Sequence, residues 1–187
     1  MSFTSKYRAL KRVINSKSLP DFIYRMDERG VATVRQLGLQ PKGNRTDGIF
    51  GQVAIDPMVS VIEHVNKAYD AGGSCNLADP YISCFDWKAL QPINAATLAF
   101  MQGYANGYVY MIDTATVTAA GRQLYYANEV FDRAERASQY RGQREWSCYG
   151  VIPASAIRFM ITVPYLMTQL AAGNNAPNPM TLTWQGV

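Results

Sequence analysis

The sequence predicts a mixed α/β (α+β) fold in which two small sheets, mixed or antiparallel, pack together with flanking helices. Three observations support this prediction. Helical and strand-like segments interleave along the chain, but without the regular spacing of βαβ units. The sequence contains no glycine-rich dinucleotide fingerprint, which argues against a doubly wound nucleotide-binding sheet. Its 187 residues suffice for one compact domain that buries roughly 70% of its unfolded surface.

The individual elements follow from apolar periodicity and from signals at their ends. Asp56-Pro57 is a suitable N-cap and first turn for a helix from Met58, and Gly72-Gly73 ends that helix. Aromatic and aliphatic residues dominate Glu145 to Ile152, a predicted strand that Pro153 ends. In the first half of the chain we expect a helix at Lys6 to Asn15, a strand at Phe22 to Asp27, a loop to Gln52, the helix from Met58 and a strand around Ser83. In the second half we expect a helix at Ala95 to Tyr104, a strand at Gly107 to Asp113, a helix at Tyr126 to Ala137, the Glu145 strand, and strands at Arg158 to Val163 and Met180 to Trp184.

An arginine occupies the middle of the first predicted strand. Strand alternation places Tyr24 toward the core and puts Arg25 and Asp27 on the opposite side. Because an unpaired guanidinium is costly to bury, Arg25 needs an anionic partner. That partner is either a carboxylate, Asp27 or Asp21, in a structural ion pair, or a phosphate, whose oxygens match the guanidinium fork.

Two further segments carry side chains suited to a reactive site. Ser83 either hydrogen-bonds a neighbouring carboxylate and fixes its rotamer, or is an ordinary strand or turn residue. Gln143 and Glu145 are two residues apart, so we expect both on one strand face. There the carboxylate is suited to stabilise a developing positive charge, and the amide is suited to orient a nucleophile. The same spacing also occurs in strands that carry only a solvated glutamate.

Taken in order, these segments resemble the bacterial mono-ADP-ribosyltransferase toxins and effectors, in particular the group that includes the catalytic subunit of pertussis toxin. Tyr24-Arg25-Met26-Asp27-Glu28-Arg29 matches the Tyr-Arg-x-Asp-x-Arg segment of that group. Ile82-Ser83-Cys84 keeps only the middle of its Ser-Thr-Ser-type strand. Gln143-Arg144-Glu145 matches its Gln/Glu-x-Glu element, and Ile152 to Ile157 resembles the Ile-Pro-x-x-x-Ile stretch that follows. The resemblance spans about residues 20 to 165.

The resemblance implies an ADP-ribosyltransferase-like fold with an NAD cleft between the two sheets. It also implies NAD-dependent transfer of ADP-ribose to a macromolecular acceptor, without a metal. Cleavage of the nicotinamide–ribose bond has an oxocarbenium-like transition state, as in glycoside hydrolysis. By the resemblance, Glu145 stabilises that cation through the ribose 2′-hydroxyl, Gln143 positions the acceptor nucleophile, and Ser83 orients Glu145. The residues implied to bind NAD are Arg25, Ser83, Asp27 and Tyr24.

The acceptor is expected to bind at the loop from Ala134 to Gly142, where we expect Tyr140 and Arg141 to contact it. His64, the only histidine, lies at the edge of the apolar stripe of its helix. The resemblance places it near the acceptor; the alternative is a partly exposed helix histidine. A Gln at the first position of Gln-x-Glu argues against an arginine-directed enzyme. Cysteine, asparagine and nucleic-acid bases all stay open as acceptors.

We expect two parts in the chain, a basic N-terminal helical extension at residues 1–18 and the transferase domain at 19–187. Five basic residues precede any acidic one. Such a segment is suited to contact an acidic surface, nucleic acid or a membrane, and in composition it resembles a transit peptide. The alternative is the solvated face of an amphipathic capping helix. The formal net charge of +4 leaves an anionic partner open.

No secretory signal peptide is visible at Met1, and no run is long and apolar enough to span a bilayer. We therefore expect a secreted or injected toxin or effector that acts in the target-cell cytosol, with a delivery partner or a cognate immunity protein.

The chain has three cysteines, Cys75, Cys84 and Cys148, so at least one thiol is unpaired in a monomer. Cys148 faces away from Glu145 along its strand and is expected in the core.

Two other functions stay open. A catalytically inactive adaptor on the same fold would bind a partner without cleaving NAD, and the degenerate Ile82-Ser83-Cys84 segment favours it. An NAD glycohydrolase would cleave NAD quickly and transfer ADP-ribose to no acceptor.

Overall fold

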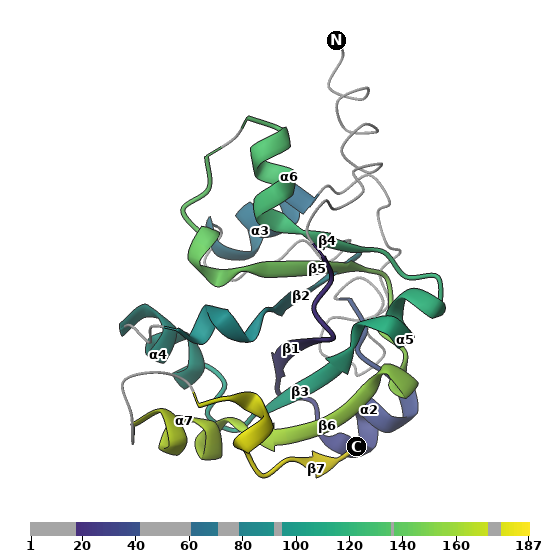
Figure 1. The fold of residues 1–187 in the computed structure, drawn as a ribbon, viewed down its shortest axis with the longest axis vertical. Coiled ribbons are helices and arrows are strands. Elements are labelled where there is room, and N and C mark those ends of the chain that lie inside the picture. Colours follow the sequence, from purple (N-terminus) through teal and green to yellow (C-terminus); the bar gives the residue numbers. More distant parts are fainter. Residues whose placement is uncertain (1–17, 42–60, 71–78, 92–94, 136, 172–176) are drawn as a thin grey trace.

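The computed structural model describes residues 18–41, 61–70, 79–91, 95–135, 137–171 and 177–187, and these confirm the expected α+β class (Figure 1). The strands are β1 (Phe22–Asp27), β2 (Tyr81–Phe85), β3 (Tyr108–Asp113), β4 (Leu124–Tyr126), β5 (Glu145–Tyr149), β6 (Ile157–Thr162) and β7 (Gln185–Gly186). The α-helices are α2 (Val31–Leu37), α3 (Val61–Asp70), α4 (Ala95–Gln102), α5 (Thr114–Ala119), α6 (Ala127–Arg133) and α7 (Val163–Ala171). Short 3-10 helices are η2 (Trp87–Leu90), η3 (Arg141–Gln143), η4 (Ala154–Ala156) and η5 (Pro179–Thr181).

The strands form one antiparallel sheet in the order β4-β5-β2-β1-β3-β6-β7, but its two halves are joined weakly. Strands β1 and β2 share a single register pair, Tyr24 with Phe85. By contrast, β2 pairs with β5 from Tyr81 to Phe85, and β1 pairs with β3 along its whole length. In Figure 1 the half with β4, β5 and β2 diverges from the half with β1, β3 and β6. The two sheets expected from the sequence are therefore two halves of one hydrogen-bonded sheet.

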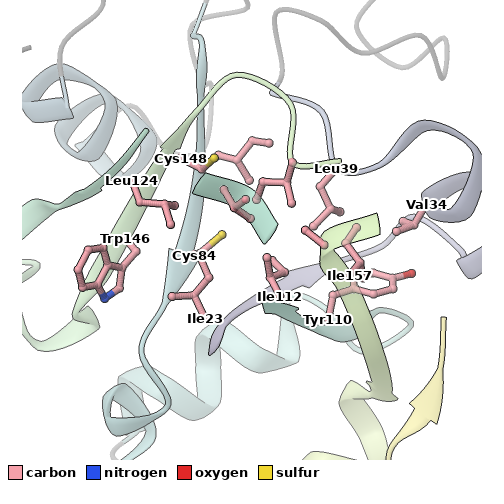
Figure 2. Close-up of a cluster of buried hydrophobic side chains, with 14 of the residues drawn as sticks. Ile23, Val34, Leu39, Cys84, Tyr110, Ile112, Leu124, Trp146, Cys148 and Ile157 are labelled. Atoms are coloured by element: carbon pink, nitrogen blue, oxygen red, sulfur yellow. The ribbon is translucent and has the colours of Figure 1, made fainter. Parts of the chain in front are cut away.

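One face of both halves buries the main hydrophobic core (Figure 2). Ile23 of β1, Tyr110 of β3 and Trp146 of β5 meet there with no exposed surface. Burying a large apolar side chain stabilises a fold by about 1.5–3 kcal/mol, so this face holds the halves together. Cys148 lies in the same core as a free thiol, as predicted, and burial raises its pKa to about 12.

Alternation along β2 and β5 sends a second set of side chains to the other face. Trp146 enters the core, whereas Glu145 and Ser147 point toward a cluster that contains residues of α3 and α6. Val61 and Val65 of α3 are buried in that cluster, and His64 lies one residue before Val65 on the same helix. The amphipathic pattern of α3 thus turns the histidine toward β2 and β5.

Several expected elements differ from the structure. The strand predicted to Ile152 ends at Tyr149, and the predicted C-terminal strand from Met180 is instead η5 followed by β7. Asn178 caps η5 by accepting the Met180 N–H, a local turn that the apolar pattern concealed. Strand β4 was not predicted because its three residues are too few for periodicity to show. The N-terminal helix, Cys75 and Gly72-Gly73 lie outside the described residues.

A glycine fixes the connection after α2. Gly38 has φ +68°, the left-handed region, and closes the helix by donating its N–H to the carbonyl of Val34. A Cβ at this position would lie 2.3 Å from the carbonyl oxygen of Ile152. Leu39 then pairs with Ile152 in an isolated antiparallel bridge. In the part of the chain that the structure describes, no helix is long and apolar enough to cross a membrane.

Candidate active site

Glu145, the first residue of β5, is a buried carboxylate with only 4% of its surface exposed. Its Oε1 accepts a hydrogen bond of 2.9 Å from Oγ of Ser147 and lies 3.1 Å from Nε2 of His64. Its Oε2 is also buried, and among the described residues it has no hydrogen-bond partner. Because a buried carboxylate oxygen without a donor is costly, Oε2 is the acceptor of this site that still lacks a donor among the described residues.

His64 connects Glu145 to a second carboxylate. Its Nδ1 lies 2.5 Å from Oδ2 of Asp79, and its Nε2 lies 2.8 Å from Oγ of Ser83. The other oxygen of Asp79 accepts the backbone N–H of Tyr81 at 2.9 Å. The side chains of His64 and Asp79 are each 5% exposed, so the alternative of a partly exposed helix histidine is wrong.

The two carboxylates decide the charge of His64. Burial alone would lower its pKa, but the hydrogen bond and the charge of Asp79, together with Glu145, outweigh burial and raise the pKa to about 10. At neutral pH the ring is therefore an imidazolium that donates from both nitrogens. Its Nε2–H is shared between Ser83 and Glu145, so it fixes one oxygen of Glu145.

Ser83 does not contact Glu145 in the way the sequence predicted. Ser83 and Ser147 are direct neighbours in the β2–β5 register, and it is Ser147 that donates to Glu145. The Ser83 hydroxyl contacts His64 instead, and therefore reaches Glu145 through the imidazolium. Strand alternation explains the correction, because Ser147 lies two residues after Glu145 on the same face.

Arg25 lies at the point where β1 and β2 diverge. Its Nε donates to Oδ2 of Asp27 at 2.9 Å, and its Nη1 donates to the carbonyl oxygen of Ser83 at 2.7 Å. The guanidinium thus connects the two halves of the sheet just beyond their single register pair. The predicted ion pair exists, and Asp27 rather than Asp21 forms it. Burial would lower the pKa of Arg25, but the charge of Asp27 outweighs it and raises the pKa above its ordinary value.

Asp27 holds two arginines at once. Arg29 donates to Asp27 through Nε at 2.7 Å, through Nη2 at 2.6 Å and through its backbone N–H at 3.0 Å. Burial would raise the pKa of Asp27, but the bonds and charges of Arg29 and Arg25 lower it well below the usual range. The hydroxyl of Tyr110 donates to the carbonyl of Arg29 and fixes the turn. Through these contacts Asp27 holds the Arg25 side chain in place.

The structure buries Tyr24 on β1, where it pairs with Phe85, the β2 residue that itself pairs with Glu145. Its side chain is 3% exposed and packs against Phe85, Trp87 and Trp184, on the strand face opposite Arg25. Burial raises its pKa to about 12. The expected contact between Tyr24 and NAD stays a prediction.

Gln143 and Glu145 do not share a strand face, contrary to the sequence-based expectation. Gln143 is the last residue of the 3-10 helix η3, and Arg144 between the two has left-handed backbone angles, φ 49° and ψ 46°. Strand alternation therefore does not extend back to Gln143. Its half-buried side chain makes no hydrogen bond with any residue that the structure describes.

Tyr140 and Arg141 lie immediately before Gln143, in the segment expected to meet an acceptor. Arg141 forms an exposed ion pair with Asp132, and its carbonyl accepts a 3.0 Å hydrogen bond from Asn128. The hydroxyl of Tyr140 accepts from Nε2 of Gln139 at 2.7 Å. Their contact with an acceptor stays a prediction.

Sequence reasoning missed Ser147, Asp79 and Arg29. Alternation from Glu145 was a sufficient signal for Ser147, and the second arginine of the Tyr-Arg-x-Asp-x-Arg segment was visible as Arg29. Asp79 gave no signal, because its partner His64 lies on a separate helix. The described residues contain no group of three or more metal-ligating side chains arranged to hold an ion.

Comparisons with known proteins add one family and several similar structures. The family described as "Domain of unknown function (DUF7587)" matches residues 52–166, more than half of the chain. No curated protein matches the sequence. The Scabin toxin from Streptomyces scabies in complex with NADH is 20% identical, with a TM-score of 0.44, and the match covers 75% of this chain and 63% of that one.

Two further solved structures resemble this chain with comparable sequence identity, TM-score and coverage. A variant of the Scabin toxin is 18% identical, with a TM-score of 0.45, and the match covers 82% of this chain and 73% of that one. A protein described as a guanine-specific ADP-ribosyltransferase is 18% identical, with a TM-score of 0.46 and coverage of 78% and 68%. This chain spans under two thirds of the Scabin chain that holds NADH.

Proposed function

The chain belongs to the DUF7587 family, whose description names no activity, and we propose that it is an NAD-dependent mono-ADP-ribosyltransferase. The observation that carries the proposal is the state of Glu145. One carboxylate oxygen is fixed by Ser147 and His64, and the other is buried without a partner among the described residues. A carboxylate held in this way is preorganised to act on a group that acquires positive charge.

NAD supplies a ribose whose bond to nicotinamide breaks with development of positive charge on the sugar. Oε2 of Glu145 accepts a hydrogen bond from the ribose 2′-hydroxyl and stabilises that charge. Because Ser147 and His64 hold Oε1, the carboxylate does not have to reorganise as the charge develops. His64 lies between the two carboxylates, with Nε2 against Oε1 of Glu145 and Nδ1 against Oδ2 of Asp79.

Arg25 serves as the anchor for a phosphate of NAD. Its Nε and Nη1 are occupied by Asp27 and Ser83, while its Nη2 has no partner among the described residues. The side chain is 19% exposed, which leaves the guanidinium partly accessible to an anionic ligand. A guanidinium already held on two sides loses little conformational freedom when it binds a phosphate oxygen.

Gln143 orients the nucleophile in this proposal. Its half-buried amide stands two residues before Glu145 along the chain and is not engaged by any described residue. The proposed acceptor is a macromolecule, either a protein or a nucleic acid, and Tyr140 and Arg141 are its proposed contacts. The resemblance to the pertussis-type group supports a toxin or effector role in a target-cell cytosol, with a delivery partner or an immunity protein.

The proposal is tested by incubating the purified chain with NAD labelled in its adenylate part, with and without cell extract. Label on macromolecules is the expected result, and Glu145→Gln should abolish it. Glu129→Gln is the matched control, because Glu129 forms a salt bridge with Arg133 on α6 outside the site. Release of free labelled ADP-ribose without macromolecular label would identify a glycohydrolase. Unchanged NAD under all conditions would leave the binding adaptor and overturn the proposal.

A further inference from the structure

Arg144 adopts an unfavourable backbone conformation between the two residues assigned to the reaction. Its φ of 49° and ψ of 46° lie in the left-handed region, which is costly for a residue with a Cβ. Such a conformation persists only where the surroundings enforce it. At this position it decides how the chain enters β5, and hence where Gln143 stands relative to Glu145.

Asp86 is the residue that enforces it. The backbone N–H of Asp86 donates to the carbonyl oxygen of Arg144 at 3.3 Å. In return, the guanidinium of Arg144 donates to Oδ2 of Asp86, from Nη2 at 3.0 Å and from Nε at 3.4 Å. One aspartate thus holds both the main chain and the side chain of Arg144, and we refer to the two residues as the Asp86–Arg144 clamp.

The clamp is attached to rigid structure on both sides. Oδ1 of Asp86 accepts the N–H of Lys88 at 3.0 Å and caps η2, where Trp87 and Leu90 are buried in the core. Phe85, the residue before Asp86, is the register partner of Glu145. The clamp therefore continues the β2–β5 pairing by one further step, beyond the last strand pair.

The turn on the other side of the clamp is also held. Gln143 donates its backbone N–H to the carbonyl of Tyr140 at 3.0 Å, and Arg144 donates its own to Arg141 at 3.2 Å. Both peptides that flank Gln143 are thus fixed, while its side chain is left for other partners.

We propose that the Asp86–Arg144 clamp positions Gln143 against Glu145 and thereby sets how well the nucleophile is oriented. Its catalytic consequence rests on the proposed transferase function. Asp86 and Arg144 are positioning residues, because they act on the reaction through the backbone on either side of Gln143. Displacing a positioned group by about 1 Å can cost up to 10²-fold in rate, so a modest shift of Gln143 is measurable.

The kinetic test compares nicotinamide release from NAD by the full chain and its variants, with cell extract present as the source of the macromolecular acceptor. Asp86→Asn and Arg144→Ala should lower kcat by about 10- to 100-fold. KM for NAD should change little, since Arg25 is untouched. Arg144→Lys keeps a cation for Asp86 and should retain most of kcat. The matched control is Arg158→Ala, because Asp113 also caps a helix while pairing with Arg158. The Arg158→Ala variant should keep the wild-type kcat and the wild-type KM for NAD.

A double-mutant cycle with Gln143→Ala tests whether the loss of kcat in Arg144→Ala arises from displacement of Gln143. If the clamp acts through Gln143, Arg144→Ala adds no further loss of kcat in the Gln143→Ala background. Fully additive losses would overturn the proposal.

Amide NMR separates failure of the clamp from failure of the proposed function. A wild-type chain that releases no nicotinamide would refute the transferase, but the clamp is still judged by the Gln143 backbone amide. Asp86→Asn should shift that resonance and speed its hydrogen exchange, whereas Arg158→Ala should leave it unchanged. An unaltered Gln143 amide in Asp86→Asn would overturn the clamp whatever the activity.

Discussion

Nε2 of His64 lies 3.1 Å from Oε1 of Glu145, so a histidine on α3 and a glutamate on β5 form a buried ion pair. Asp79 contacts the other ring nitrogen, and the two carboxylates together keep the imidazole protonated. The arrangement leaves one glutamate oxygen constrained and the other facing no donor in the described part of the chain. This asymmetry within one carboxylate is the basis of the proposed chemistry.

The first prediction concerns stability against pH. The pKa of His64 is about 10 in the folded chain, above the value of about 6.5 for an unperturbed histidine. The histidine therefore binds its proton more tightly when folded, and its contribution to stability is full below about pH 6.5 and declines as pH rises toward 10. The midpoint of thermal unfolding should fall over this range in the wild type.

The variant His64→Gln serves as the comparison. It should be less stable at neutral pH and should show a shallower decline of the unfolding midpoint between pH 6.5 and 10. Parallel curves for the two proteins would contradict a protonated His64.

The second prediction separates the two serines. Ser147→Ala removes a direct donor to Glu145 and should lower kcat for NAD cleavage by roughly tenfold, the equivalent of a charge-assisted hydrogen bond of about 1.5 kcal/mol. Ser83→Ala removes a contact to His64 and should have a smaller effect. Steady-state kinetics on both variants measure which of the two loses more kcat. A larger loss for Ser83→Ala would mean that Ser83 contacts Glu145 or NAD directly.

The third prediction concerns Arg25. In Arg25→Lys a single ammonium cannot reach Asp27, Ser83 and a phosphate at once. KM for NAD should rise by about tenfold or more, with a smaller change in kcat, because the variant loses a contact made in both ground and transition states. Isothermal titration with NAD measures the same loss as weaker binding. Unaltered affinity would remove Arg25 from the proposed phosphate site.

The fourth prediction tests the fold. Gly38→Ala combines a left-handed φ with a Cβ only 2.3 Å from the carbonyl of Ile152. The backbone must shift, so we expect a loss of at least about 1–2 kcal/mol in the free energy of unfolding. Urea denaturation measures it. Gly121→Ala is the control, because its φ is +73° but nothing lies near the added Cβ. Equal losses in the two variants would mean that strain in φ, not the contact with Ile152, is the cause.

Local sequence rules predicted the parts of the site that lie on single strands. The Arg25–Asp27 pair follows from two residues on one side of β1, and the burial of Cys148 follows from alternation along β5. The same rule, carried two residues past Glu145, would have found Ser147. These relationships need no knowledge of which elements pack together.

The other parts depend on packing or on strain, which the sequence does not reveal locally. The contact between His64 and Glu145 exists only because α3 lies against β2 and β5. The left-handed Arg144 gave no signal, because glycine and asparagine are the residues that usually mark such a conformation. Gln143 was therefore assigned to the wrong face, although the Gln-x-Glu motif was recognised.

The most direct test of the central claim is the rate of nicotinamide release from NAD by the wild-type chain and by Glu145→Gln. The variant keeps the size of the side chain and loses the charge. We expect release by the wild type and a rate lower by roughly 10²–10³-fold in the variant, with NAD binding and the folded state retained. Equal rates in the two proteins, or no release by either, would contradict a catalytic role for Glu145.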